Sequence, residues 1–334
     1  MSSGKRRSRQ RGSALVVTLL VFAIGIALVV PMYSEYTLFV KRSSNQFAAE
    51  QGYSYLRGGE QLAVLALQQD AEFDQSEDDL RDDLSEFWAQ DTQAYPLDEG
   101  GWLQGQLEDL QGRLSLNALD EAPGEGKRFS PPQERFIRLL QMFEEPQVSQ
   151  QDAILITEAV LDWMDSDSVP RDFGAEDDHY YDAQPPYRAA NRGFTSVSEL
   201  RAVAYVTPQI YLAVAPYLNA VRDAPRINVN TAPLEVLRTL SAAGDYQPLS
   251  VQDGQNLIDL RGENGFESTE AFLEIPLFAD REDPASLSGA ISLNTAYFLF
   301  RGEADVADRI SRLYSVLHRE GQQVQVLARA SGSL

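Results

Sequence analysis

Residues 13–34 form an uncharged, almost wholly apolar run, SALVVTLLVFAIGIALVVPMYS. A helix that crosses a bilayer needs about 20 predominantly apolar residues, so this run is long enough to do so. The pattern after it predicts that the helix continues, with residues 13–34 in the membrane and residues 35–70 outside it. The apolar positions that recur near helical spacing in this continuation are Tyr36, Phe39, Val40, Phe47, Tyr55, Leu62 and Leu65.

The residues before the apolar run are basic. Residues 1–12 contain five Lys or Arg side chains and no acid, and the positive-inside rule keeps such an end cytoplasmic. An ordinary secretory signal has a small-residue cleavage site after its apolar core, whereas here the small residues Gly12 and Ser13 precede the core. Hydropathy alone leaves two interpretations open: an uncleaved signal anchor, or a leader of residues 1–12 that is cut after Gly12 so that the helix is retained.

The rest of the chain shows strand-like patterns at two places and helical patterns between them. Residues 100–119 predict a hairpin, and residues 312–331 predict two strands about an Arg-Glu-Gly turn. We therefore expect an α+β fold, with a small sheet domain of residues 71–119 and 286–334 and a helical domain of residues 120–285 inserted in it. The helix-period stretches are Gln133–Phe143, Asp152–Met164, Ser198–Val203, Gln209–Val221, Leu234–Leu240, Val251–Leu260 and Thr269–Leu273.

Charge and composition narrow the possible partners. The net charge is −22 and falls to −27 once residues 1–12 are set aside, so the body repels phosphate backbones and anionic lipids. The chain has no cysteine and only two histidines, which excludes disulfides, thiolate metal sites and cysteine nucleophiles. Residues 70–91 are rich in acids interleaved with apolar side chains, and this pattern predicts a short amphipathic helix with a solvated acidic face.

Three segments resemble one another weakly: RLSLNAL (113–119), RINVNTAP (226–233) and AISLNTAYF (290–298). Each places an asparagine after a short strand-like run, without the regularity of a solenoid. The second segment opens a stretch, residues 227–273, that resembles the helix-hairpin-helix pattern of DNA-binding proteins. That stretch lacks the compact glycine hairpin, and the segment joining its two helices has no lysine. Together with the acidic body, this rejects a nucleic-acid function while the similarity of fold is retained.

The densest candidate chemistry lies in residues 162–200, DWMDSDSVPRDFGAEDDHYYDAQPPYRAANRGFTSVSEL. Asp162 and Asp165 are one turn apart near the end of a predicted helix, where the helix dipole disfavours anions, and more carboxylates follow in a loop. A hard cation such as Ca²⁺, with about 6–8 oxygen ligands, is suited to neutralise them, although the spacing differs from that of an EF-hand. The residues leave three interpretations open: a calcium site, a solvated acidic loop, or a catalytic carboxylate pair.

The N-terminal sequence RQRGSALVVTLLVF resembles the leader of type IV prepilins. In that family a dedicated peptidase cuts after the glycine, here Gly12, and methylates the new N-terminal residue, here Ser13. Most members carry glutamate at the fifth mature position, where this chain has Val17. The minor pseudopilin K of type II secretion usually lacks that glutamate. Patches similar to the K subunit follow in the family's order: LEDLQGRLSLNAL, DWMDSD, GAED, PPYRAAN, FTSVSEL and INVNTAP.

The resemblance implies a fold, a metal and a role for Val17. It implies a pilin-type α/β sheet with a large inserted helical domain, and a structural Ca²⁺ in the acidic loop. Family members often carry a cysteine pair near this loop, which this chain lacks. At the filament-packing position Val17, the missing carboxylate suits a tip subunit that has no neighbour above it. The implied calcium ligands are Asp165, Asp167, Asp172, Glu176 and Asp177.

The resemblance also implies a location and partners. It describes a single-pass protein of the inner membrane of a Gram-negative bacterium, with its C-terminal domain in the periplasm. The implied role is the non-catalytic tip that initiates or caps the type II secretion pseudopilus during export across the outer membrane. The implied partners are the minor pseudopilins I, J and H, the prepilin peptidase and the inner-membrane assembly platform. Two rival functions are a DNA-uptake protein and a signal-anchored hydrolase that uses the acidic cluster.

Overall fold

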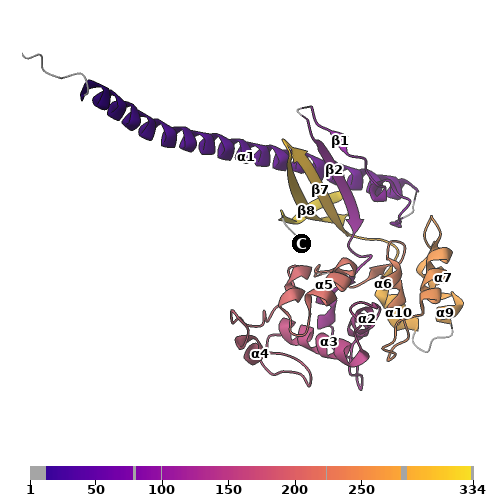
Figure 1. Ribbon diagram of the computed structural model, residues 1–334. Helices are drawn as coiled ribbons and strands as arrows, with labels where there is room; N and C mark the ends of the chain where they lie inside the picture. The colour runs from indigo at the N-terminus through magenta and orange to yellow at the C-terminus, as the bar shows by residue number, and fades with distance from the viewer. Residues whose placement is uncertain (1–12, 78–79, 99, 223, 280–283, 332–334) are drawn as a thin grey trace, which may run out of the picture.

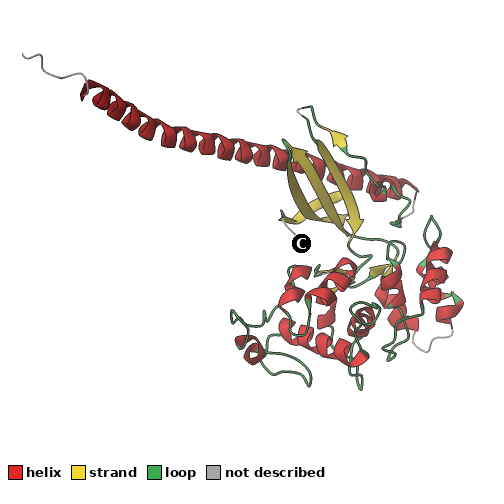
Figure 2. Ribbon diagram, in the orientation of Figure 1, coloured by secondary structure: helices red, strands yellow, loops and turns green. Residues whose placement is uncertain are grey.

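The computed structural model describes all residues except 1–12, 78–79, 99, 223, 280–283 and 332–334. One long helix, a five-stranded sheet and a helical region make up the molecule (Figures 1 and 2). The helices other than the first are α2 (Pro131–Leu140), α3 (Gln150–Met164), α4 (Asp177–Tyr181), α5 (Pro208–Val214), α6 (Leu234–Arg238), α7 (Val251–Arg261), α8 (Thr269–Leu273), α9 (Pro276–Ala279) and α10 (Pro284–Ala290). Short 3-10 helices are η1 (Phe87–Ala89), η2 (Leu116–Asp120), η3 (Val197–Ala202) and η4 (Ala215–Tyr217).

Helix α1 (Ser13–Glu77) is continuous and extends beyond the expected end at residue 70. Its N-terminal half projects away from the rest of the molecule (Figure 1). An 18-residue window of this helix has a mean hydropathy of 2.9 and no buried residue, which fits a transmembrane anchor. Farther along, Ala48, Leu56, Ala63 and Leu67 are buried at intervals of one or two helical turns, so this half of α1 turns one face to the sheet.

The sheet is antiparallel, in the order β1-β2-β7-β8-β9. One face packs on α1 through Leu56 and Leu67 of the helix and Phe298, Phe300 and Leu317 of the sheet. Short parallel pairs, β3 with β4 and β5 with β6, lie in the inserted region. The strands are β1 (Tyr95–Pro96), β2 (Trp102–Asp109), β3 (Leu114–Ser115), β4 (Leu218–Asn219), β5 (Ile227–Asn228), β6 (Ile291–Ser292), β7 (Tyr297–Val306), β8 (Arg309–Glu320) and β9 (Gln323–Ala330).

The expected C-terminal strands are confirmed, since β8 and β9 meet at Gly321, whose φ is 57°. Strand β7, which lies at the centre of the sheet, was not predicted. Its first four residues, Tyr297 to Phe300, are all buried, because α1 covers one face and a cluster with Leu110 and Ala224 covers the other. A strand buried on both faces loses the alternation of polar and apolar residues by which strands are recognised.

The expected hairpin in residues 100–119 is wrong. Strand β2 pairs with β1 and β7, and the chain then leaves the sheet, so that Leu114 pairs in parallel with Leu218. The exit is at Asp109, which accepts a hydrogen bond from the Gln111 backbone N–H at 2.6 Å. Gly112 then passes so close to Thr231 that a Cβ would lie 2.9 Å from its hydroxyl. A distant segment thus redirects the chain where the sequence suggested a local turn.

The inserted region lies between β2 and β7 in the chain and is mostly helical, as expected (Figure 2). Its core includes Phe136, Ile137, Ile156 and Val160 of α2 and α3. Two differences from the expected helices are that residues 197–202 form a 3-10 helix, and that the helix expected up to residue 221 ends as α5 at Val214. Two of the three mutually similar segments pair in register as β5 and β6, where Ile227 opposes Ile291 and Asn228 opposes Ser292.

The expected amphipathic helix in residues 70–91 is also wrong. Residues 70–77 belong to α1, and within residues 80–91 only Phe87–Ala89 are helical. The backbone N–H of Asp82 instead donates to the Leu293 carbonyl at 2.8 Å, and the Asp82 side chain is fully buried. Tertiary partners therefore replace the local helix, and the acids are not a solvated face.

Candidate functional site

The acidic loop follows α3, whose last residue is Met164. Ligand atoms of Asp165, Asp167 and Glu176 all lie within 4.8 Å of one another. We call this group the loop cluster. The other two expected ligands, Asp172 and Asp177, are outside it, and Asp177 accepts a hydrogen bond from the backbone of Ala189 at 3.1 Å.

Glu176 is the buried carboxylate of the loop cluster. The residue is 6% exposed, and neither carboxylate oxygen makes a hydrogen bond of normal geometry, although the Asp177 backbone N–H lies near enough to lower the pKa slightly. Burial, with the nearby charges of Asp162, Asp165 and Asp167, raises the pKa of Glu176 to about 7. A buried carboxylate without well-placed donors is costly. Because its oxygens lie beside two more carboxylates, the arrangement fits a hard cation that takes oxygen ligands.

Asp162 lies behind the loop cluster and ties the loop to α3. Its side chain is fully buried and accepts a hydrogen bond from the Arg171 backbone N–H at 3.1 Å. The Arg171 guanidinium forms ion pairs with both Asp162 and Asp165. Glu158, one turn earlier on α3, accepts from the backbone N–H of Phe173 at 2.8 Å. These contacts close the loop against α3 without a disulfide.

Glycine at position 174 is a requirement of this closure. A Cβ on Gly174 would lie 1.7 Å from an Asp162 carboxylate oxygen, so any other residue would displace the carboxylate. Beyond the loop, Tyr180 of α4 packs edge-on against Trp163 of α3, with ring centroids 5.2 Å apart. The end of α3 and helix α4 are thus held against each other at the two ends of the loop.

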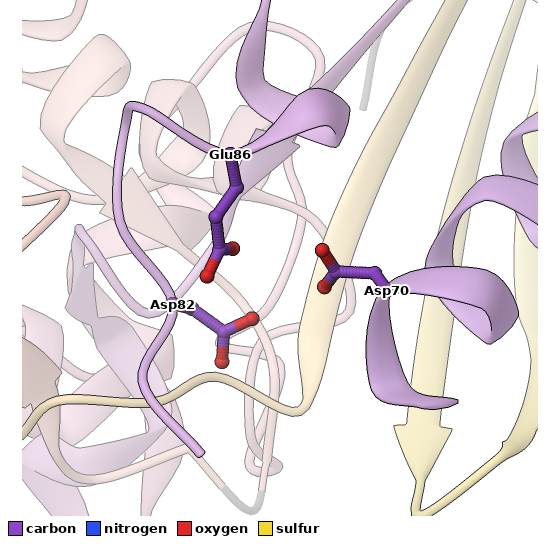
Figure 3. A group of neighbouring side chains, drawn as sticks. All are labelled: Asp70, Asp82 and Glu86. Atoms are coloured by element: carbon purple, nitrogen blue, oxygen red, sulfur yellow. The ribbon is translucent and has the colours of Figure 1, made fainter. Parts of the chain in front are cut away.

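A second group of carboxylates lies at the junction of α1, the sheet and the inserted region. Figure 3 shows Asp70 of α1 pointing toward Asp82 and Glu86, and their ligand atoms lie within 4.8 Å of one another. We call this group the seam cluster. Arg319 of β8 forms ion pairs with Asp70, at 2.7 Å, and with Asp82. Burial and the charges of Asp70 and Asp82 raise the pKa of Glu86 to about 9.

Hydrogen bonds connect the seam cluster to the inserted region. The backbone N–H of Thr295 donates to the Asp82 carboxylate at 2.7 Å. The Asn228 side-chain amide donates to the Asp82 carbonyl and to the Asp109 carboxylate, each at 3.0 Å. Asn228 and Thr295 belong to the mutually similar segments of the sequence. That similarity is the signal that could have located the seam, although it does not indicate the acidic partners.

The expected N-terminal sites lie at the start of α1. Gly12 is outside the described residues, and Ser13 is the first residue of the helix. Val17 is exposed, as are its apolar neighbours Val16 and Leu19. The side chain is thus available to a neighbouring helix or to lipid.

The comparisons with known proteins agree along most of the chain. Models of the family described as "Type II secretion system (T2SS), protein K" match residues 112–223 and 227–294. The chain is 32% identical to the type II secretion system protein K of Pseudomonas aeruginosa, over 98% of this chain and 94% of that protein. It is 30% identical to the protein K of Aeromonas hydrophila, over 97% and 98% of the two chains.

A solved structure extends the agreement to the fold. The crystal structure of the GspK-GspI-GspJ complex from the enterotoxigenic Escherichia coli type 2 secretion system contains a similar chain. The TM-score is 0.75 at 26% identity, and the match covers 88% of this chain and all of the other. The expected mixed fold with a long apolar N-terminal helix is thereby confirmed. The chain belongs to the type II secretion system protein K family and is a minor pseudopilin of type II secretion.

Proposed function

We propose that this chain forms the tip of the pseudopilus, in complex with minor pseudopilins I and J, and that it initiates or caps the filament. The observation that carries the proposal is the bulk of the inserted region, which lies beside the C-terminal half of α1 (Figure 1). In a filament of parallel helices, this bulk would obstruct a further subunit above. Val17 is consistent with this place, because a tip subunit needs no carboxylate to pair with a subunit above it.

The surface proposed for the partners is the apolar side of α1 that the sheet leaves uncovered. It runs from the membrane segment toward the C-terminal end of the helix, and such an extended apolar surface is typical of protein interfaces. The solved relative was crystallised with GspI and GspJ, which supports helices of those proteins as its occupants. The exposed side chains are Tyr36, Leu38, Phe39, Val40, Phe47, Tyr53, Leu62, Leu65 and Phe73.

Co-purification of the full chain with I and J from detergent tests this surface. We expect Leu62→Glu and Leu65→Glu to lose both partners, because each places a charge in an apolar helix interface. Val251→Glu on α7 is the matched control, since Val251 is exposed to a similar extent, 60% against 65% for Leu62. Complexes that survive the α1 substitutions as well as the control would exclude this surface.

The same proposal places the chain in the cell envelope. The leader of residues 1–12 is cytoplasmic, α1 crosses the inner membrane once, and the sheet and inserted region lie in the periplasm. The prepilin peptidase cuts between Gly12 and Ser13, and the assembly platform and pseudopilin H are further partners. Mass spectrometry of the mature N-terminus tests this: N-methyl-Ser13 is expected, and an intact Met1 would refute the processing.

Calcium is the proposed ligand of the loop cluster, held by Asp165, Asp167 and Glu176. When bound, the ion supplies the positive charge that the buried Glu176 carboxylate lacks, so its role is structural. Ca²⁺ at 100 times its dissociation constant should stabilise the protein by about 2.7 kcal/mol, which raises Tm by about 4 °C for a chain of this length. Asp167→Asn should abolish the rise, and Asp178→Asn, an exposed control outside the cluster, should keep it. An unchanged Tm between Ca²⁺ and EGTA would refute the site.

We propose neither catalysis nor DNA binding. The stretch that resembles a helix-hairpin-helix contains α6 and α7, and its arginines contact the backbone. Arg238 donates to the Leu249 carbonyl at 2.8 Å, and Arg261 donates to the Ala232 carbonyl at 2.7 Å. Phosphate binding would compete with these contacts and with the acidic body. A salt-dependent mobility shift with duplex or single-stranded DNA would contradict this, as would a hydrolase activity abolished by Asp165→Ala.

A further inference from the structure

A cationic side chain, Arg171, lies against the loop cluster. The Arg171 guanidinium contacts Asp162 and Asp165, and the exposed fractions of the three side chains differ: 0% for Asp162, 20% for Asp165 and 39% for Arg171. The buried Asp162 fixes Arg171 in place, because it pairs with the guanidinium and also accepts a hydrogen bond from the Arg171 backbone N–H. The charged end of Arg171 thus reaches outward to Asp165, a proposed calcium ligand.

The three carboxylates of the loop cluster are neutralised unevenly. Asp165 shares the guanidinium, whereas neither oxygen of Glu176 makes a hydrogen bond of normal geometry. Arg171 therefore offsets part of the negative charge without satisfying the buried Glu176. The loop can therefore fold without a bound ion, while the Glu176 carboxylate still lacks a neutralising positive charge.

We infer that Arg171 is a tethered counter-ion: it holds the loop in its ion-free form and competes with Ca²⁺ for Asp165. The inference rests on the calcium proposal and concerns its regulation. A divalent ion beside Asp165 repels the guanidinium, and Arg171 lowers the affinity of the loop for that ion. Because Arg171 is partly exposed, its long side chain has room to leave Asp165 while the backbone N–H keeps its bond to Asp162.

The opposite role is that of a structural clamp, in which Arg171 prepares the loop for the ion. The two roles predict opposite changes when the charge is removed. Loss of a clamp disorders the ligands and weakens calcium binding. Loss of a competing charge strengthens it, because a unit charge about 4–5 Å from a divalent ion costs at least a tenfold change in affinity even at the dielectric constant of water. The sign of the change in affinity therefore decides between them.

The test is calorimetric titration of Ca²⁺ into the full chain in detergent, after treatment with EGTA. For Arg171→Gln we expect about tenfold tighter binding together with a lower Tm in the ion-free protein. Arg171→Lys keeps the charge and should bind within about twofold of the native chain. Arg188→Gln is the control: Arg188 lies in the same acidic segment, is 71% exposed and is 3.9 Å from Asp177, outside the cluster. It should change affinity by less than about twofold.

The outcomes separate this inference from the calcium proposal. If the native chain binds Ca²⁺ and Arg171→Gln binds it equally or more weakly, the counter-ion role is wrong and the calcium site stands. If neither the native chain nor Arg171→Gln binds Ca²⁺, both fail. A circular dichroism spectrum and retention of I and J by Arg171→Gln verify that the variant is folded, so that weaker binding is not read from a misfolded protein.

Discussion

Two clusters of three carboxylates among the described residues have similar compositions and differ in how their charges are neutralised. In the seam cluster, Arg319 is 8% exposed and bonds to both Asp70 and Asp82, while Glu86 retains a proton and accepts from Trp88. In the loop cluster, Arg171 is 39% exposed and reaches only one of the three carboxylates, Asp165. The number of acids thus does not identify a metal site. What distinguishes the loop cluster is the pair of buried Glu176 oxygens without hydrogen bonds of normal geometry.

The difference follows from where each cluster lies. The seam joins α1, β8 and the segment before η1, and its partners come from positions more than 200 residues apart in sequence. Such a junction is stable when its charges are satisfied internally. The loop is a surface segment whose partners lie within about 15 residues, so solvent and ions reach it. The seam cluster has the contacts of a structural joint, and the loop cluster is the proposed calcium site.

Removal of Arg319 should have the largest effect. Arg319→Ala leaves Asp70 and Asp82 without their buried cation, and loss of one partner of a buried ion pair costs about 3–5 kcal/mol. We expect the free energy of unfolding to fall by that amount, and the loss to be the same in Ca²⁺ and in EGTA. Differential scanning calorimetry in both buffers measures it.

Arg312→Ala is the control for that prediction. Arg312 also lies on β8 and pairs with Glu303 at 2.9 Å, but it is 50% exposed, so its loss should cost less than about 1 kcal/mol. Equal losses for the two variants would show that the seam is not a specially stabilised joint.

Glu176→Gln should act on the loop cluster in two directions. The variant loses the stabilisation by Ca²⁺, because the buried ligand charge is removed. In EGTA it should be more stable than the native chain by about 1–2 kcal/mol, since an unsatisfied buried carboxylate becomes a neutral amide. Thermal unfolding in the two buffers gives both values. A variant less stable than the native chain in EGTA would mean that the ion-free loop does not carry this cost.

The smallest effect is expected from Glu86→Gln, and it depends on pH. The pKa of Glu86 is raised to about 9 from the usual value of 4.5, so the folded protein holds a proton that the unfolded chain releases. Its contribution to stability is complete below about pH 4.5 and is lost as pH rises through about 9. Because Glu86 is only half-buried, screening by solvent should limit the effect to about 1 kcal/mol. At pH 8.5 the variant should therefore unfold about 1–2 °C higher than the native chain.

The pH profile provides the control for Glu86. At pH 5 the native chain and Glu86→Gln should differ much less, because little of the native contribution has been lost there. Asp91→Asn, an exposed acid in the segment that follows η1, should leave the profile unchanged. If the unfolding temperature of the native chain falls no more steeply than that of Glu86→Gln between pH 5 and 9, the seam cluster holds no proton.

The elements that the sequence predicted correctly are those whose pattern is local. The apolar run of α1, the helices α2, α3 and α7 and the strands β8 and β9 all show their periodicity within a few turns or pleats. The wrong predictions concern segments whose structure is set by contacts with residues far away in the sequence. Strand β7 is buried on both faces, and β2 pairs with β1 and β7 instead of the expected hairpin partner. Residues 80–86 form no helix, because Asp82 bonds to Arg319 of β8 and to Thr295.

The candidate site divides in the same way. The sequence by itself determined the family, the anchor helix and an acidic loop after α3, because each depends on residues that are close together along the chain. Only the tertiary structure decided which carboxylates meet. It brought Asp165, Asp167 and Glu176 together, placed Asp172 and Asp177 apart from them, and buried Asp82 at the seam. Burial and hydrogen-bond partners set the charge state of a carboxylate, and both arise from segments that fold onto it from elsewhere in the chain.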